Sequence, residues 1–253
     1  MTNSSGLCVS HLLKSFGGNK VSNDVSFEAK KGEVTCLVGP NGAGKTTIFN
    51  LISGFARPDS GAVSVDGKNI TGLPPHKLLQ HGVARTFQHL RLFNELTVFE
   101  NLYLGVKGIG ETFFKSFFST KKTPQQKAAV NEVENLLQEY HLGDMKNEVV
   151  GRLPYGQQKL VSLARALISK PEYLLLDEGT SGVDPAVLME MTKSVRSLPD
   201  RGVSVLMIEH NMDVVKELAD TLIFLHHGQV LASGTPEEIV NNKQLTAIYF
   251  GEQ

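Results

Sequence analysis

The sequence contains no tryptophan, only two cysteines and no excess of charge of either sign. Cys8 and Cys36 lie in separate apolar stretches without a CxxC pair, which excludes a disulfide framework and favours a reducing compartment. Because 25 basic residues face 26 acidic ones, the totals indicate neither a nucleic-acid-binding surface nor a polybasic membrane patch. The function must therefore reside in local sites.

Long hydrophobic runs are also missing. No stretch approaches the ~18 apolar residues of a membrane-spanning helix, and the N-terminal segment lacks the features of a secretory signal. We therefore expect a soluble protein, which does not exclude docking on an embedded partner. With 253 residues, 41% of them hydrophobic, the chain can form a substantial core in one large or two small domains.

Strand patterns dominate both ends of the chain, and helical patterns dominate its middle. Short β-branched stretches in residues 7–27 predict antiparallel strands, and the apolar run at 33–39 predicts a parallel strand covered on both faces. From 97 to 168 apolar residues recur at helical spacing, and after 171 strands and helices alternate. The order predicts a helical subdomain inserted in an α/β sheet.

Residues 108–124 carry four phenylalanines among small and basic residues. The favoured interpretation is a cover whose aromatic rings pack on neighbouring helices. The alternative is a patch that faces a membrane or a partner.

The stretch GPNGAGKT, residues 39–46, has the glycine, lysine and hydroxyl spacing of a phosphate-binding loop. It follows a predicted strand and opens a predicted helix, so backbone N–H groups and the helix dipole can attract phosphate. Lys45 adds a charge for the β- and γ-phosphates, and the Thr46 hydroxyl can ligate Mg²⁺. A chance match in this context is improbable.

Two carboxylates end the strand-like run YLLLDE. Asp177 fits the partner that holds the Mg²⁺ shell, and Glu178 fits a base that polarises water. Since adjacent strand residues point to opposite faces, the two need not compete for one metal position. Gln88 and His210 end other strand-like runs and belong near the same nucleotide, because parallel sheets bind ligands at their carboxyl ends. Each of these strand ends is weak evidence alone; the phosphate loop upstream strengthens all of them.

In order and spacing, these motifs resemble those of the nucleotide-binding subunit of ABC transporters along essentially the whole chain. The resemblance implies ATP and Mg²⁺ as cofactors and Glu178, His210 and Lys45 as catalytic residues. It implies a metal site of Thr46, Gln88 and Asp177. The nucleotide contacts that it implies are Phe16, Gly39, Pro40, Asn41, Gly42, Ala43, Gly44, Lys45, Thr46, Thr47, Gln88, Tyr155, Gly156, Gln157 and Asp184.

The resemblance assigns a part to each motif. Phe16 would stack on adenine, Gln88 would contact Mg²⁺ and report to the membrane subunits, and LPYGQ at 153–157 would be the signature segment. Asp184 would end the D-loop, and His210 would contact the γ-phosphate.

The fold implied is a P-loop NTPase core of mainly parallel sheet, with an antiparallel N-terminal β-subdomain and an inserted α-helical subdomain. In a single ABC-type ATPase domain, residues 1–93 and 169–253 would form the core and 94–168 the helical part.

Members of this family work in pairs, with ATP between the phosphate loop of one subunit and the signature segment of the other. The partners implied are transmembrane permease subunits, a second identical or related ATP-binding subunit and, indirectly, a solute-binding protein, but no nucleic acid. The chain would lie peripherally on the cytoplasmic face of the inner or plasma membrane. Its permease docking surface would lie between the core and the helical insert, near residues 88–101.

A narrower resemblance is to the branched-chain amino acid importer branch, which includes urea and amide importers. It is carried by GVARTFQHLRLFNELTVFENL, YGQQ, MIEHNMDVV and the ending TPEEIVNN to AIYFGE. A lipid or lipopolysaccharide exporter is a nearer alternative than a soluble protein acting on DNA or ribosomes, because a second cassette and a long coiled-coil insertion are missing.

Three residues depart from the general family pattern. Pro154 and Tyr155 stand where serine and glycine are usual, and Gly179 stands where proline usually follows Glu178. A lost hydrogen bond to phosphate costs about 1.5–3 kcal/mol, yet proline is tolerated in a first helical turn and the helix dipole remains. We therefore predict a modified clamp; the alternative is a hydrolytically weak site in a nucleotide-gated partner. Gly179 is expected to loosen the turn after Glu178 by about 0.4–1 kcal/mol.

Overall fold

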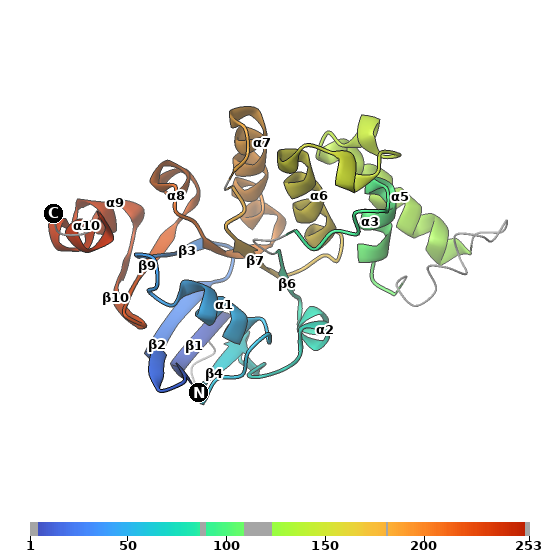
Figure 1. The fold of residues 1–253 in the computed structure, drawn as a ribbon. Helices are drawn as coiled ribbons and strands as arrows, with labels where there is room; N and C mark the ends of the chain where they lie inside the picture. The colour runs from blue at the N-terminus through green and yellow to red at the C-terminus, as the bar shows by residue number, and fades with distance from the viewer. Residues whose placement is uncertain (1–4, 87–89, 109–122, 181, 251–253) are drawn as a thin grey trace.

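The computed structural model describes residues 5–86, 90–108, 123–180 and 182–250, which form two sheets with helices around them (Figure 1). The strands are β1 (Gly6–Phe16), β2 (Asn19–Lys30), β3 (Val34–Val38), β4 (Ser60–Val65), β5 (Lys68–Asn69), β6 (Val83–Arg85), β7 (Tyr173–Asp177), β8 (Ser204–Ile208), β9 (Thr221–His226) and β10 (Gln229–Gly234). The α-helices are α1 (Lys45–Ile52), α2 (Pro75–Leu78), α3 (Val98–Gly105), α5 (Pro124–Glu139), α6 (Tyr155–Leu167), α7 (Pro185–Arg196), α8 (Met212–Leu218), α9 (Pro236–Asn241) and α10 (Lys243–Phe250). Short 3₁₀ turns are η1 (Leu79–His81), η3 (Gly143–Met145), η4 (Val150–Arg152) and η5 (Pro199–Arg201).

The larger sheet has the strand order β10-β9-β3-β8-β7-β6. Neighbouring strands from β9 to β6 are parallel, and β10 returns antiparallel beside β9. All five residues of β3, β7 and β8 are buried, as expected for parallel strands covered on both faces. The carboxyl end of β3 therefore opens between β8 and β9, in the interior of the sheet.

The smaller sheet has the order β2-β1-β4-β5 and is antiparallel throughout. It lies with α1 on one side of the larger sheet, while α7 and α8 lie on the other side (Figure 1). The predicted architecture, a mainly parallel sheet with an antiparallel N-terminal sheet and inserted helices, is confirmed.

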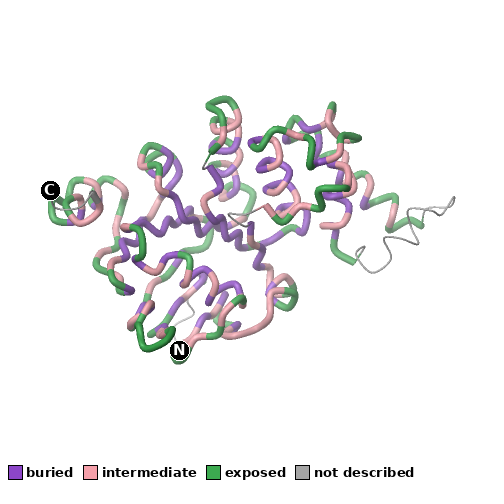
Figure 2. Tube along the Cα trace, viewed as in Figure 1, coloured by how far each residue is buried: buried purple, intermediate pink, exposed green. Residues whose placement is uncertain are grey.

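Strand alternation divides the interior into two apolar cores. On β7, Leu174 and Leu176 join the core formed with the helices of the middle and C-terminal parts, and Leu175 joins the core formed with α1 and the smaller sheet. Figure 2 shows the buried strands as a purple band through the centre of the molecule. This band holds the strand ends that carry the candidate site.

The inserted helices α3, α5 and α6 pack together through the faces that periodicity predicts. Ten of the apolar residues that recur at helical spacing in 97–168 are buried: Ala129, Val133, Leu136, Leu137, Tyr140, Leu160, Leu163, Ala164, Leu167 and Ile168. Capping boxes begin α3 at Thr97 and α5 at Thr123, so both starts have a local cause. Most of the phenylalanine-rich segment lies outside the described residues.

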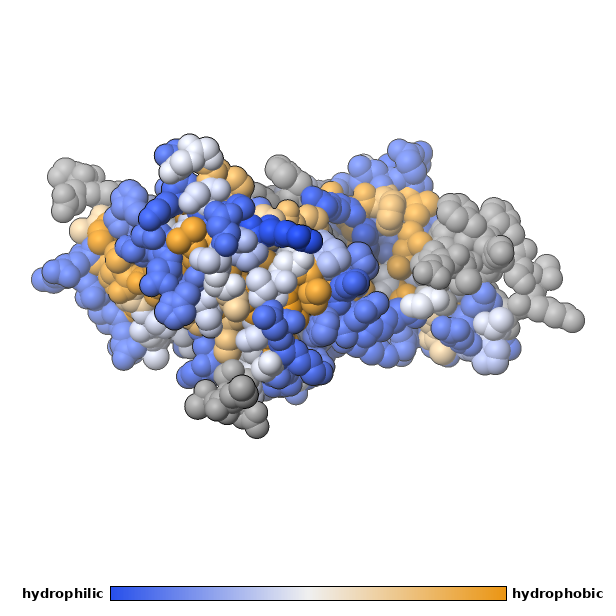
Figure 3. All heavy atoms as spheres, turned by 90° about the horizontal axis from the view of Figure 1, so that it is seen from below, coloured by the Kyte–Doolittle hydropathy of each residue, from blue (hydrophilic) through white to orange (hydrophobic). Residues whose placement is uncertain are grey.

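In the described ranges, no helix has the length and hydrophobicity needed to cross a bilayer. Figure 3 shows the face seen from below, where polar residues interrupt the apolar patches.

Candidate nucleotide site

The phosphate loop joins the end of β3 to the start of α1. Three of its glycines have positive φ: 149° at Gly39, 81° at Gly42 and 102° at Gly44. A Cβ on Gly39 would lie 2.1 Å from the Leu225 carbonyl oxygen, and one on Gly44 would lie 2.6 Å from the Val21 carbonyl oxygen. Glycine is therefore required at both positions by conformation and by space.

The Lys45 side chain makes hydrogen bonds to the backbone of its own loop. Its side chain is buried, and Nζ donates to the carbonyl oxygens of Gly39 at 2.6 Å and Pro40 at 2.9 Å. Burial lowers the pKa of the Lys45 ammonium, and the charge of Glu178 opposes that shift. The ammonium thus lies at the mouth of the anion-binding loop.

A cavity of about 210 Å³ opens over the loop. Its lining residues are Val21, Asn41, Gly42, Ala43, Gly44, Lys45, Thr46, Thr47, Glu178 and His210. The structure thus brings the predicted loop, base and histidine together, and adds Val21, which the sequence did not single out. Phe16, with 52% of its surface exposed at the end of β1, does not line this cavity.

Asp177 ends β7 as one half of a buried ion pair. Its Oδ2 accepts a hydrogen bond from Arg85 Nη2 at 2.6 Å, with 3% of the aspartate and 7% of the arginine side chain exposed. Arg85 Nη1 also donates to Asn50 Oδ1 on α1 at 2.9 Å. Burial lowers the pKa of the Arg85 guanidinium, and Asp177 opposes that shift. Sequence reasoning assigned no role to Arg85, although it lies in the stretch ARTFQ that ends at Gln88.

The other oxygen of this carboxylate bears on metal binding. Asp177 Oδ1 is buried and has no hydrogen-bond partner among the residues that the structure describes. A carboxylate oxygen in that state fits a cation or its hydration shell, and the Thr46 hydroxyl in the cavity is a second oxygen donor. Gln88, the third expected ligand, lies outside the described residues.

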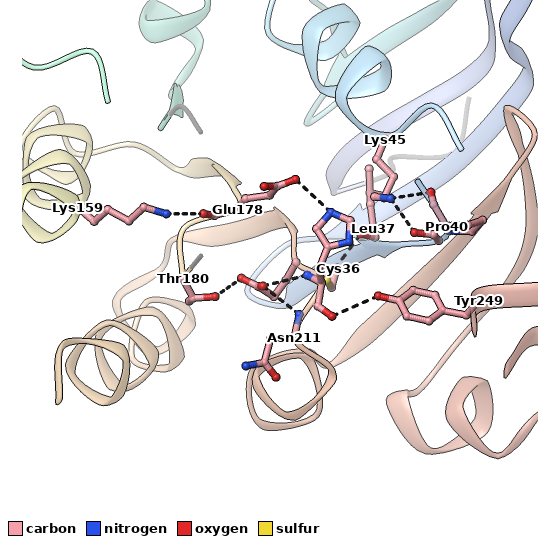
Figure 4. A network of polar contacts seen from close by, with 12 residues as sticks. Cys36, Leu37, Pro40, Lys45, Lys159, Glu178, Thr180, Asn211 and Tyr249 are labelled. Carbon is pink, nitrogen blue, oxygen red and sulfur yellow. Dashed lines mark hydrogen bonds and ion pairs between the residues drawn. The ribbon is translucent and has the colours of Figure 1, made fainter. Parts of the chain in front are cut away.

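Glu178 lies one residue beyond β7 and has φ 48°, a left-handed conformation that is rare for residues other than glycine. Strand alternation therefore does not orient it, which corrects the prediction from the YLLLDE pattern. Glu178 N donates to the Ile208 carbonyl at 3.1 Å. Glu178 Oε1 lies 3.1 Å from His210 Nε2, and a dashed line marks this contact in Figure 4. The predicted base and histidine are thus in direct contact.

Gly179 follows Glu178 in this turn, and the residue with the left-handed conformation is Glu178. A Cβ at Gly179 would lie 3.0 Å from the Leu176 side chain. The small residue thus provides space beside β7.

Glu209 is a buried carboxylate that sequence reasoning missed. Its Oε1 accepts hydrogen bonds from the backbone of His210 at 2.9 Å and Asn211 at 3.1 Å, and Oε2 accepts one from Thr180 Oγ1 (Figure 4). Glu209 therefore links the backbone around His210 to Thr180, in the segment that follows Glu178. Its place directly before His210 in the sequence was the available signal.

The signature segment forms the start of α6. Pro154 is the N-cap, with φ −53° and ψ 147°, and Tyr155 is the first helical residue, so the proline does not stand inside the first turn as expected. Asp184 caps α7 by accepting from the N–H groups of the second and third residues after it. A Cβ on Gly156 would lie 3.4 Å from Asp184 Oδ2, so the two segments are neighbours.

None of the four predicted contacts in these segments, which are Tyr155, Gly156, Gln157 and Asp184, lines the cavity over the phosphate loop. Tyr155 is 47% exposed. One chain therefore places the two groups of predicted nucleotide contacts on separate surfaces.

Known proteins are similar to this chain in sequence and in fold. Residues 22–181 match the family described as ABC transporter. The chain is 37% identical over 247 residues to the high-affinity branched-chain amino acid transport ATP-binding protein BraF of Pseudomonas aeruginosa, covering 96% of this chain and 97% of that protein. It is 37% identical to the corresponding ATP-binding protein LivG of Salmonella typhimurium, covering 97% and 98%. The structure superposes with a TM-score of 0.85 and 32% identity on the ADP conformation of an ATP-binding cassette of an ABC transporter, covering 98% and 99%.

The glycine loop, the buried aspartate, the Glu178–His210 contact and the full-length similarity have one explanation: the chain belongs to the ABC transporter family and is an ATP-binding cassette.

Proposed function

We propose that this chain is the ATP-hydrolysing subunit of an importer for branched-chain or other hydrophobic amino acids, peripheral on the cytoplasmic face of the membrane. The observation that carries the ATPase role is the single cavity lined by the phosphate loop, Glu178 and His210. The names of the BraF and LivG relatives support the solute class.

The predicted site residues, inside and outside the cavity, have defined tasks in this proposal. The loop N–H groups and Lys45 bind the β- and γ-phosphates. Glu178 accepts a proton from the attacking water, and His210 holds both the glutamate and the γ-phosphate. Mg²⁺, held by Thr46, Gln88 and Asp177, would neutralise phosphate charge. Phe16, exposed on β1, stacks on the adenine ring.

The cassette acts as a pair in this proposal. Tyr155, Gly156, Gln157 and Asp184 contact the nucleotide of a second, identical or related, ATP-binding subunit. Support comes from the separation of these residues from the cavity of their own chain and from the exposed start of α6. Residues 94–168 would turn as a helical subdomain against the core formed by 1–93 and 169–253.

Restoring the usual serine by Pro154→Ser is expected to leave ATP turnover of the assembled transporter unchanged. In the proposed pair, the helix dipole and the N–H groups of the first turn of α6 would face the partner's nucleotide with or without that hydroxyl. Steady-state phosphate release at saturating ATP measures the effect. A gain of more than about tenfold, the value of one hydrogen bond to a charged phosphate, would instead favour the weak-site alternative.

A cavity of about 510 Å³ between the core and the inserted helices is the proposed permease docking groove. Phe55 and Phe93 line it with 42% and 50% of their surfaces exposed. The guanidinium of Arg91 lies 5.0 Å from the Phe55 ring centroid, and that of Arg165 lies 5.0 Å from the Phe93 ring centroid. An amphipathic segment of a permease, apolar with an acidic or carbonyl edge, would fit this lining, and the groove borders the expected stretch 88–101.

Phe93→Ser is expected to weaken co-purification of the permease subunits at least tenfold, since exposed aromatic anchors dominate interface energies. Leu231→Ser, at a residue 46% exposed on β10, is the matched control and should co-purify normally. ATP affinity of the isolated chain should be equal in both variants. Normal assembly of the Phe93 variant would remove this groove as the docking site.

Uptake in proteoliposomes tests the solute class. The chain is reconstituted with its permease subunits, its partner cassette and its binding protein, and radiolabelled leucine, isoleucine, valine, urea and acetamide are compared. ATP-dependent uptake of the three amino acids supports the proposal. Uptake of urea or acetamide alone would make the chain an amide-importer subunit, and outward lipid movement would make it an exporter subunit.

A further inference from the structure

Lys159 is a buried lysine whose contacts reach outside its own subdomain. It lies in the second turn of α6, is 4% exposed, and its Nζ donates to the backbone carbonyl of Glu178 at 2.8 Å (Figure 4). The same Nζ lies 5.3 Å from the ring centroid of Tyr155. Burial lowers the pKa of the Lys159 ammonium, while the charges of Glu209 and Glu178 oppose that shift. The positive charge of Lys159 thus lies between Tyr155 of the signature segment and the backbone of Glu178, the predicted base.

The carbonyl that Lys159 binds belongs to a strained residue. Glu178 has φ 48°, and a non-glycine residue keeps this strained left-handed conformation only where its surroundings hold it. The Glu178 N–H is bound by the Ile208 carbonyl, and the Glu178 carboxylate is bound by His210. Lys159 binds the third polar group of Glu178, its backbone carbonyl. Among these three partners, only Lys159 lies on an inserted helix.

Lys159 also lies one turn behind the exposed end of α6. Tyr155 begins that helix, is 47% exposed and packs beside Gly182 in the segment that leads to Asp184. A helix is stiff over one turn, so a displacement of its N-terminus by a bound nucleotide moves the lysine with it.

We propose that Lys159 is a positioning residue that couples nucleotide clamping by α6 at one site of the pair to the orientation of Glu178 at the other. This inference rests on the proposed paired ATPase function. When the start of α6 binds the nucleotide of the partner subunit, the Lys159 ammonium orients the Glu178 backbone through its hydrogen bond to the Glu178 carbonyl. The Glu178 carboxylate is then held where it can accept the proton of the attacking water. The coupling runs through one hydrogen bond and one rigid helix.

Lys159→Met in the assembled transporter tests the coupling. The expected result is a kcat for ATP hydrolysis about 10- to 100-fold lower, with the KM for ATP and the cooperative unfolding midpoint unchanged. This loss is smaller than the about 10²- to 10⁴-fold contribution of general-base catalysis, because the base is displaced and not removed. Lys159→Arg should recover most of the rate, because it restores a charged donor. Lys146→Met, which removes a half-exposed ion pair with Glu134 inside the helical insert, is the matched control and should behave as wild type.

Two further measurements keep the test decisive. If Lys159→Met fails to fold, Lys159→Gln takes its place in the test. Glutamine retains a hydrogen-bond donor without the charge, and this variant should also lower kcat. In a Glu178→Gln background, Lys159→Met should still form the ATP-bound pair, because the proposed role of Lys159 is to position Glu178 and not to contact nucleotide. Loss of that pair would overturn the proposal.

The proposal is overturned if Lys159→Met or Lys159→Gln hydrolyses ATP at the wild-type rate. It is equally overturned if kcat falls only together with ATP affinity and the unfolding midpoint, since that is the result of a purely structural residue. Absence of hydrolysis in the wild-type transporter, by contrast, refutes the proposed function itself.

Discussion

Replacing Glu178 with glutamine is expected to lower the steady-state rate of ATP hydrolysis about 10²- to 10⁴-fold while ATP still binds. The amide keeps the size of the side chain and its contact with His210 Nε2, now 3.1 Å from Glu178 Oε1, but it cannot accept the proton of the attacking water. The phosphate loop and Lys45 are unaltered, so nucleotide affinity should persist. ATP should therefore hold the two cassettes together without being consumed.

Phosphate release and size-exclusion chromatography with and without ATP measure the two parts of this prediction. Glu217→Gln, at an exposed position of α8, makes the same chemical change away from the cavity and should retain normal turnover. Hydrolysis by the Glu178 variant within threefold of wild type would show that another group is the base.

Arg85→Leu should cost about 3–5 kcal/mol of the free energy of unfolding, because it leaves the buried Asp177 carboxylate without its counter-charge. That loss is a large part of the total free energy of unfolding of a typical domain, which is about 5–15 kcal/mol. The guanidinium also donates to Asn50, so the change loosens the contact between β6, β7 and the phosphate-loop helix α1. ATP affinity should fall in parallel with stability.

Urea denaturation of the isolated chain measures this prediction through the midpoint at constant m-value. Lys170→Met, which removes an exposed pair with Glu132, is the control and should cost at most about 1 kcal/mol. The double variant Arg85→Leu, Asp177→Leu should recover part of the loss, because it removes both buried charges. A loss below 1 kcal/mol in the single variant would mean that Asp177 has another compensating partner.

Local signals in the sequence explain which parts of the fold and site were predictable. The phosphate loop needs glycines at fixed spacing between a strand and a helix, and the structure has that order, with positive φ at Gly39, Gly42 and Gly44. Helices α3, α5 and α9 begin at capping boxes whose partners are three residues apart. Buried strands β3, β7 and β8 are visible as continuous apolar runs.

The contacts around the base were not predictable, because they join residues far apart in the chain. Arg85 and Asp177 are 92 positions apart, Thr180 and Glu209 are 29 apart, and Lys159 and the Glu178 carbonyl are 19 apart. Neither periodicity nor a motif carries information on which buried charge a distant side chain meets. The placement of Pro154 as an N-cap and the left-handed Glu178 also depend on packing of the following helix and loop.

The chemistry of this protein was predictable from local sequence signals: a phosphate loop, two carboxylates after an apolar run and a histidine, in the order of an ABC cassette. These signals are local, since hydrogen bonds within a turn or a helix start fix them over a few residues. Three contacts arise only in the folded chain: Glu178 with His210, Arg85 with Asp177, and Lys159 of the signature helix with the Glu178 carbonyl. Burial sets these partnerships, because a charge removed from water must find a partner wherever the folded chain supplies one.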